Sequence, residues 1–123
     1  MADRLVIEMK LRFRKNSLRL RVNQREVEML AAGQELSERV TFGGGATLDY
    51  VLAPADTTKT AAEFTGGVIR VTAPLHDWAK AAEIGFYFEV EPGLKVAIEK
   101  DLECVDGPPE EKDPHAYPRT KGC

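Results

Sequence analysis

The sequence is short of the features that mark secreted, membrane-spanning or nucleic-acid-binding proteins. Only two cysteines occur in 123 residues, which excludes a disulfide-rich small domain. Charged residues interrupt every apolar stretch well before the ~18 residues that a membrane span needs, and the first residues form no signal-peptide core. The net charge of -3 gives no basic excess and argues against a nucleic-acid partner. We therefore expect a cytoplasmic protein with no membrane partner.

What the chain does contain is the composition of one globular domain. Hydrophobic residues make up 43% and charged residues 30%, and the length leaves room for a single core. After residue 104 the apolar residues thin out, and residues 105–123 hold four of the seven prolines beside several acids. We predict a single α+β domain over residues 1–104 and an acidic, proline-rich tail over residues 105–123.

Hydrophobic patterning divides the domain into strands and two short helices. Short apolar segments, most of them alternating with polar residues, predict strands over residues 5–13, 18–22, 39–42, 46–52, 62–64, 68–71, 84–90 and 94–98. Asn23 as N-cap with Glu26 three residues later predicts a helix that ends at Gly33. Pro74 opens a second helix, whose apolar stripe includes Leu75, Trp78, Ala79 and Ala82.

The predicted elements follow the order strand-strand-helix-strand-strand twice. Residues 20–22 (LRV), before the first helix, resemble residues 69–71 (IRV), before the second, and this indicates an internal ββαββ duplication. Short links between successive strands favour antiparallel hairpins. The predicted fold is α+β, a mostly antiparallel twisted sheet or half-open barrel of about eight strands with two short helices.

The first hairpin carries an unusual concentration of positive charge. A two-residue turn at residues 15–16, in which asparagine tolerates the positive φ that the turn requires, fixes the register of the hairpin. On its polar side Lys10 then faces Arg21, and Arg12 faces Arg19. Like charges directly opposite each other cost up to about 1 kcal/mol per pair, so this face requires a compensating anion. The candidate residues for binding an anion, an acidic protein partner or a second subunit are Lys10, Arg12, Arg19 and Arg21.

The compensating charge can also come from within the chain. Glu89, Glu91, Glu99 and Asp101 point outward from the last two predicted strands, and they would form an ion ladder with the first hairpin if those strands flank it. Alternatively, the acidic tail lies across the hairpin. The sequence leaves internal neutralisation and partner binding open.

A second candidate site involves the cysteines. Cys104 follows the last predicted strand next to acidic residues, which do not activate a thiol as a nucleophile. Zinc could be held by Cys104, His115 and Cys123, although no Cys-x-x-Cys pair nucleates such a site.

Five short motifs, spread over nearly the whole chain, carry a family resemblance. They are the Asn-Ser-x-Arg-x-Arg hairpin of residues 16–21, Glu26-Val27, Trp78-Ala79, the Glu-Lys-Asp-x-x-Cys motif of residues 99–104, and Tyr117-Pro118 after the acidic tail. Together they resemble a family of small uncharacterised bacterial proteins, a domain of unknown function. The chain departs from the family pattern at Lys15, where members usually have glycine, and after Pro118, where members close with Pro-Asn-Pro. The resemblance implies no activity.

The sequence therefore favours a small, non-catalytic binding or interaction module that uses the basic hairpin and no cofactor. An exposed edge strand would also allow a homodimer. The alternative hypothesis is a metal- or thiol-dependent site centred on Cys104, with the tail as its lid and zinc as its metal.

Overall fold

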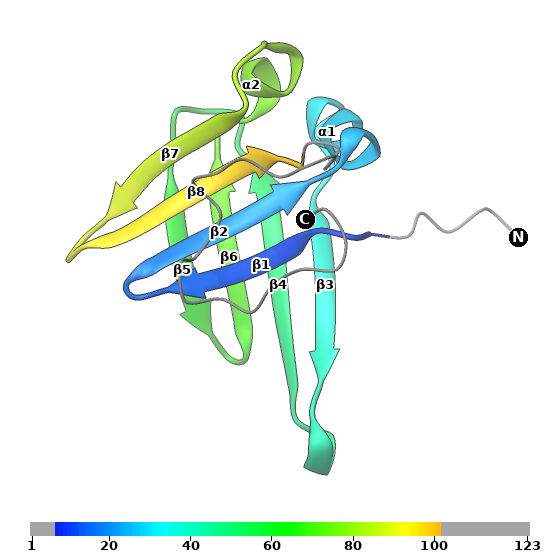
Figure 1. Ribbon diagram of the computed structural model, residues 1–123, viewed down its shortest axis with the longest axis vertical. Helices are drawn as coiled ribbons and strands as arrows, with labels where there is room; N and C mark the ends of the chain where they lie inside the picture. Colours follow the sequence, from blue (N-terminus) through cyan, green and yellow to red (C-terminus); the bar gives the residue numbers. More distant parts are fainter. Residues whose placement is uncertain (1–6, 102–123) are drawn as a thin grey trace, which may run out of the picture.

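The computed structural model describes residues 7–101, which form two four-stranded sheets and two short helices (Figure 1). The elements in chain order are β1 (Lys10–Arg14), β2 (Ser17–Val22), α1 (Gln24–Ala31), β3 (Leu36–Thr41), the 3-10 turn η1 (Gly43–Gly45), β4 (Thr47–Pro54), β5 (Ala61–Thr65), β6 (Val68–Ala73), α2 (His76–Lys80), β7 (Gly85–Val90) and β8 (Leu94–Lys100).

The two sheets share one topology. Sheet A has the order β1-β2-β8-β7 and sheet B the order β3-β4-β6-β5. In each sheet two antiparallel hairpins meet through a parallel central pair, β2 with β8 in sheet A and β4 with β6 in sheet B. Each ββαββ half gives its first hairpin to one sheet and its second hairpin to the other. If β1 to β4 are exchanged with β5 to β8, the strand order of sheet A becomes that of sheet B. An internal ββαββ duplication, as predicted from the sequence, implies this symmetry.

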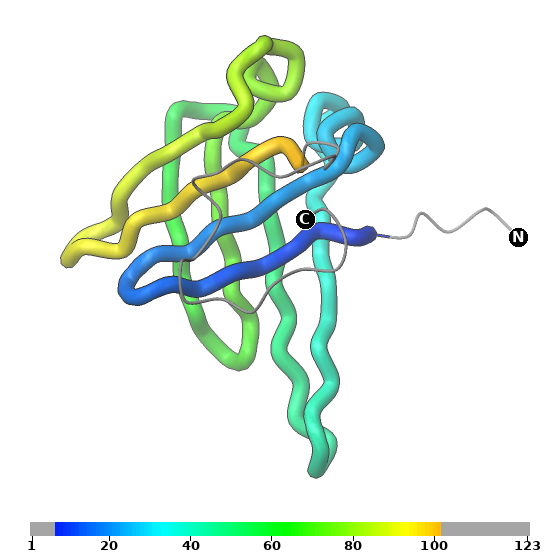
Figure 2. Tube along the Cα trace, viewed as in Figure 1, coloured from blue at the N-terminus to red at the C-terminus, as the bar shows by residue number. Residues whose placement is uncertain are grey.

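This arrangement confirms part of the predicted fold and corrects the rest. The α+β class, the eight strands and the two helices are confirmed. The single, mostly antiparallel sheet or half-open barrel is wrong, because the strands form two separate sheets and each sheet contains a parallel pair. The physical reason is that each helix carries the chain from one sheet to the other, so the two hairpins that flank a helix lie in different sheets. In Figure 2 the strands of sheet A cross in front of those of sheet B.

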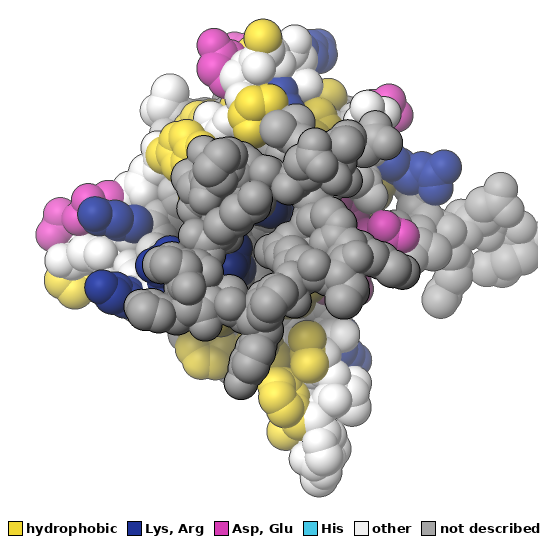
Figure 3. Space-filling model, in the orientation of Figure 1, with side chains coloured by type: hydrophobic (Ala, Val, Ile, Leu, Met, Phe, Trp, Pro, Cys, Tyr) yellow, Lys and Arg dark blue, Asp and Glu magenta, His cyan; other side chains and the backbone are white. Residues whose placement is uncertain are grey.

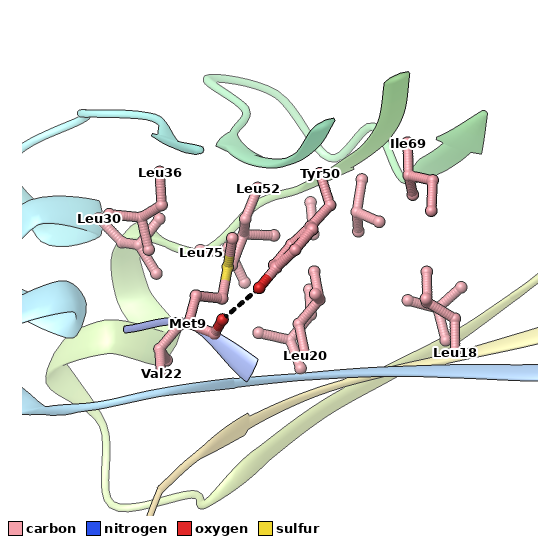
Figure 4. Close-up of a cluster of buried hydrophobic side chains, with 14 of the residues drawn as sticks. Met9, Leu18, Leu20, Val22, Leu30, Leu36, Tyr50, Leu52, Ile69 and Leu75 are labelled. Atoms are coloured by element: carbon pink, nitrogen blue, oxygen red, sulfur yellow. Dashed lines mark hydrogen bonds between the residues drawn. The ribbon is translucent and has the colours of Figure 1, made fainter. Parts of the chain in front are cut away.

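The core lies between the two sheets. Alternate residues of the inner strands face inward and are almost completely buried, among them Ile98 and the two leucines Leu20 and Leu52, which are labelled in Figure 4. Each such side chain contributes about 1.5–3 kcal/mol when it leaves water. The helices contact each other at one end of the sandwich, where Leu30 of α1 and Trp78 of α2 join the core.

Local sequence signals account for most element boundaries. The first hairpin has the predicted register, but the residue with positive φ is Lys15 (52°) and not Asn16. The capping box of α1 is present: the Asn23 side chain accepts from the Glu26 N–H, and the Glu26 carboxylate accepts from the Asn23 N–H, both at 2.9 Å. Helix α2 is shorter than predicted, because the backbone at Ala81 is already extended.

Two buried polar contacts fasten the start of β1 to the rest of the fold. The carboxylate of Glu26, only 1% exposed, also accepts a hydrogen bond from the backbone N–H of Glu8. The hydroxyl of Tyr50, on the inner face of β4, donates to the carbonyl oxygen of Met9 at 2.8 Å (Figure 4). Together they tie the segment before β1 to α1 and to sheet B. The basic first hairpin is therefore held at a fixed position over the core.

The contribution of the Tyr50 hydrogen bond can be tested by measuring the free energy of unfolding as a function of pH. Burial, followed by the charges of Glu38 and Glu26, raises the pKa of Tyr50 above its ordinary value. The stabilisation by the neutral hydroxyl is therefore present below about pH 10 and is lost as the pH rises through the higher pKa of the folded state. We expect Tyr50→Phe to lower the free energy of unfolding by about 1 kcal/mol at neutral pH and to reduce this alkaline loss.

Urea denaturation at neutral and alkaline pH measures both effects. Tyr87→Phe is the matched control, because the Tyr87 hydroxyl bonds to Glu99 on an exposed surface and its loss costs less. A Tyr50→Phe variant as stable as the wild-type protein at neutral pH would contradict the role given to this contact.

Candidate functional site

The predicted basic hairpin forms one half of the outer surface of sheet A. Because side chains alternate along a strand, Lys10, Arg12 and Arg14 of β1 share this surface with Arg19 and Arg21 of β2. We call these five residues the basic face. The structure thus brings together the four residues predicted from sequence and adds Arg14, which the same alternation could have identified two positions after Arg12.

Strand β8 places two carboxylates beside the basic face. The parallel register sets Glu99 next to Arg21, and a Glu99 oxygen lies 3.4 Å from Arg19 Nε and 3.5 Å from Arg21 Nε. Beyond the end of β8, Asp101 contacts the Lys10 ammonium at 2.7 Å. The hypothesis of internal neutralisation is therefore confirmed for these two acids.

The other two acids in that hypothesis lie elsewhere. Glu89 belongs to β7, where it faces Lys95, and Glu91 follows β7. Strand β8 separates β7 from β2, so the predicted ion ladder extends across only part of sheet A.

Two arginines of the basic face are left without an acidic partner within residues 7–101. Arg12 and Arg14 are exposed, and neither guanidinium group makes a hydrogen bond or an ion pair with another residue of that range. An open depression of about 240 Å³ is lined by Lys10, Leu11, Arg12, Arg19 and Arg21, and a smaller one of about 60 Å³ by Arg12, Arg14, Ser17 and Arg19. Lys and Arg side chains gather near the hairpin ends of sheet A (Figure 3). This part of the surface can accept further negative charge.

An aromatic residue that sequence reasoning missed lies on the same surface. The Tyr87 hydroxyl donates to Glu99 at 2.9 Å, so Glu99 joins Tyr87 to the two arginines of β2. Partial burial, the hydrogen bond to Glu99 and the Glu99 charge raise the pKa of Tyr87, while Arg19 opposes the shift. Strand alternation places Tyr87 outward, but only the pairing of β8 with β2 shows that it is near the arginines.

The alternative site cannot be located in the described part of the chain. Cys104, His115 and Cys123 all lie outside residues 7–101. Within that range, no group of three or more His, Cys, Asp and Glu side chains could hold a metal ion. Over the same residues, no helix combines the length and the apolar character needed to cross a membrane.

Comparison with known protein families gives one match. The model of a family of unknown function, DUF7009, matches residues 9–121. The chain belongs to this family. The prediction that it is a member of a family without an assigned function is thereby confirmed. The DUF7009 match begins one residue before β1 and continues through most of the acidic tail, so both the basic face and the tail lie inside the family's range.

No curated protein and no solved structure matches the chain. Membership in DUF7009 therefore assigns no activity, and a function has to be argued from the surface itself.

The link between Glu99 and Tyr87 predicts a measurable change in titration. Glu99→Gln removes the charge that helps to raise the Tyr87 pKa, so this pKa should fall toward its ordinary value while the contribution of burial remains. An NMR titration of the tyrosine side chains measures the shift. Asp49→Asn, which removes a carboxylate from sheet B, is the control and should leave Tyr87 unchanged. An unaltered Tyr87 pKa in Glu99→Gln would contradict the described surface.

Proposed function

We propose that this DUF7009 member is a non-catalytic binding module that takes an acidic protein segment on the basic face. The observation that carries the proposal is the unequal pairing of the five cations. Lys10, Arg19 and Arg21 already contact carboxylates of the chain, whereas Arg12 and Arg14 have no acidic partner within residues 7–101. Their exposed guanidinium groups can form bidentate hydrogen bonds with further carboxylates.

Two features favour an acidic protein segment over nucleic acid. The face already holds the carboxylates of Glu99 and Asp101, so its spacing suits this group. Tyr87, an exposed aromatic on this surface, has its hydroxyl bound to Glu99 and lies on β7, with β2 and β8 between it and Arg12. These features favour an acidic protein segment, and the experiment compares it with nucleic acid as the alternative ligand.

A labelled acidic peptide tests the proposal directly. We expect fluorescein-labelled deca-glutamate to bind the wild-type protein, with an affinity that falls as salt screens the charges. The double variant Arg12→Gln/Arg14→Gln should bind about tenfold more weakly, which corresponds to about 1.4 kcal/mol. Fluorescence anisotropy measures the affinities.

A matched variant separates a specific site from a general effect of charge. Arg25→Gln/Lys59→Gln removes the same charge from exposed positions outside the basic face and should bind as the wild type does. Equal losses in the two double variants would overturn the proposal, because the peptide would then respond only to net charge. Tighter binding of a DNA duplex than of the peptide would favour nucleic acid instead.

Self-association is a second candidate function that a specific observation favours. Two apolar side chains are exposed at the β3 edge of sheet B, Phe42 (53%) and Val40 (40%), and edge strand β3 has one unpaired side within residues 7–101. Figure 3 shows hydrophobic side chains near the protruding β3–β4 hairpin. We infer that a second copy covers this region, as single exposed patches of this kind often mark interfaces.

Sedimentation velocity distinguishes the two states. We expect the wild-type protein to sediment as a dimer at micromolar concentration, and Phe42→Ser to shift it to the monomer. Thr57→Ser changes an exposed residue in the loop between β4 and β5; it is the control and should leave the dimer intact. A wild-type monomer would contradict this inference.

The remaining expectations stay predictions. They are the bacterial source, the cytoplasmic location and a zinc or thiol site at Cys104, His115 and Cys123.

A further inference from the structure

We propose that the chain's own acidic segment, residues 102–113, occupies the basic face, so that an outside partner binds there only by displacing it. This inference rests on the function proposed above and names the regulation of the same site. It begins from the place where the described chain ends. The Asp101 N–H donates to the Val22 carbonyl at 2.7 Å, and the Asp101 carboxylate contacts Lys10 at 2.7 Å. The described part of the chain therefore ends at the edge of the basic face.

The charge of the following segment complements that face. Residues 102–113 hold five acids, Glu103, Asp106, Glu110, Glu111 and Asp113, against one lysine, Lys112. Arg12 and Arg14 are the cations of the basic face that have no acidic partner within residues 7–101. Opposite charges at such positions attract, and an acid bound to Arg12 would also relieve its repulsion with Arg19.

The segment is long enough to reach these arginines. Twelve residues span up to about 40 Å when extended, whereas the five residues of β1 rise only about 17 Å. Pro108 and Pro109 favour an extended backbone. A short tether also gives its segment a local concentration of about a millimolar, so even weak carboxylate–guanidinium contacts are populated. A partner must therefore be more acidic, or present at higher concentration, than the tethered segment.

The test neutralises the segment within the full-length chain. In the tail variant, the five acids become Gln or Asn: Glu103→Gln, Asp106→Asn, Glu110→Gln, Glu111→Gln and Asp113→Asn. In the control variant, five exposed acids away from the basic face are neutralised in the same way: Glu28→Gln, Asp56→Asn, Glu63→Gln, Asp77→Asn and Glu83→Gln. The two variants have the same net charge and differ only in where the acids were removed.

We expect labelled deca-glutamate to bind the tail variant about tenfold more tightly than the control variant. Adding Arg12→Gln/Arg14→Gln to the tail variant should abolish this gain. Without peptide, the Nε–Hε NMR signals of Arg12 and Arg14 should shift between the wild-type protein and the tail variant, and should stay in place in the control variant.

The outcomes separate this inference from the function on which it rests. If tail and control variants bind the peptide equally while Arg12→Gln/Arg14→Gln still weakens binding, the basic face binds acidic segments but the tail does not occupy it. If Arg12→Gln/Arg14→Gln has no effect in either background, the proposed function itself is wrong.

Discussion

The parallel pairing of β2 with β8 is the contact on which the rest of the structure depends. It joins the first hairpin to the last one and completes sheet A, and its inner face supplies Leu20 and Ile98 to the core. On the outer face the same register sets Glu99 beside Arg21. Because residues on opposite faces alternate, a shift of one residue would expose the apolar row and bury the charged row. Core packing therefore fixes the charge pattern of the surface.

That charge pattern is only partly compensated within the described chain. Three cations of the basic face have carboxylate contacts at the β2–β8 side, but β1 is an edge strand, and no described strand lies beyond it. Arg12 and Arg14 consequently lie where an acid can approach from outside the sheet. A surface ion pair contributes little to stability, so an acid bound at these two arginines would contribute little to folding and would serve the recognition that we propose.

Sequence reasoning identified what depends on neighbouring residues. The register of the first hairpin and the capping box between Asn23 and Glu26 follow from short-range patterns, and both are confirmed. The parallel pairs β2–β8 and β4–β6 could not be predicted from such patterns. Alternation shows which residues of a strand share a face, but not which other strand lies beside that strand. For the same reason, the sequence could propose Glu99 as a partner of the basic hairpin but could not choose it over Glu89. The bond from Tyr50 to Met9 is likewise a contact between distant segments.

The central claim is that acidic segments bind at β1 and β2 of sheet A. The most direct test is an NMR titration of the ¹⁵N-labelled full-length protein with deca-glutamate, in which every backbone amide is followed. The account predicts that the largest shifts occur in residues 10–21, around Arg12 and Arg14. Shifts centred on sheet B or on the exposed β3–β4 hairpin, with β1 unchanged, would contradict it.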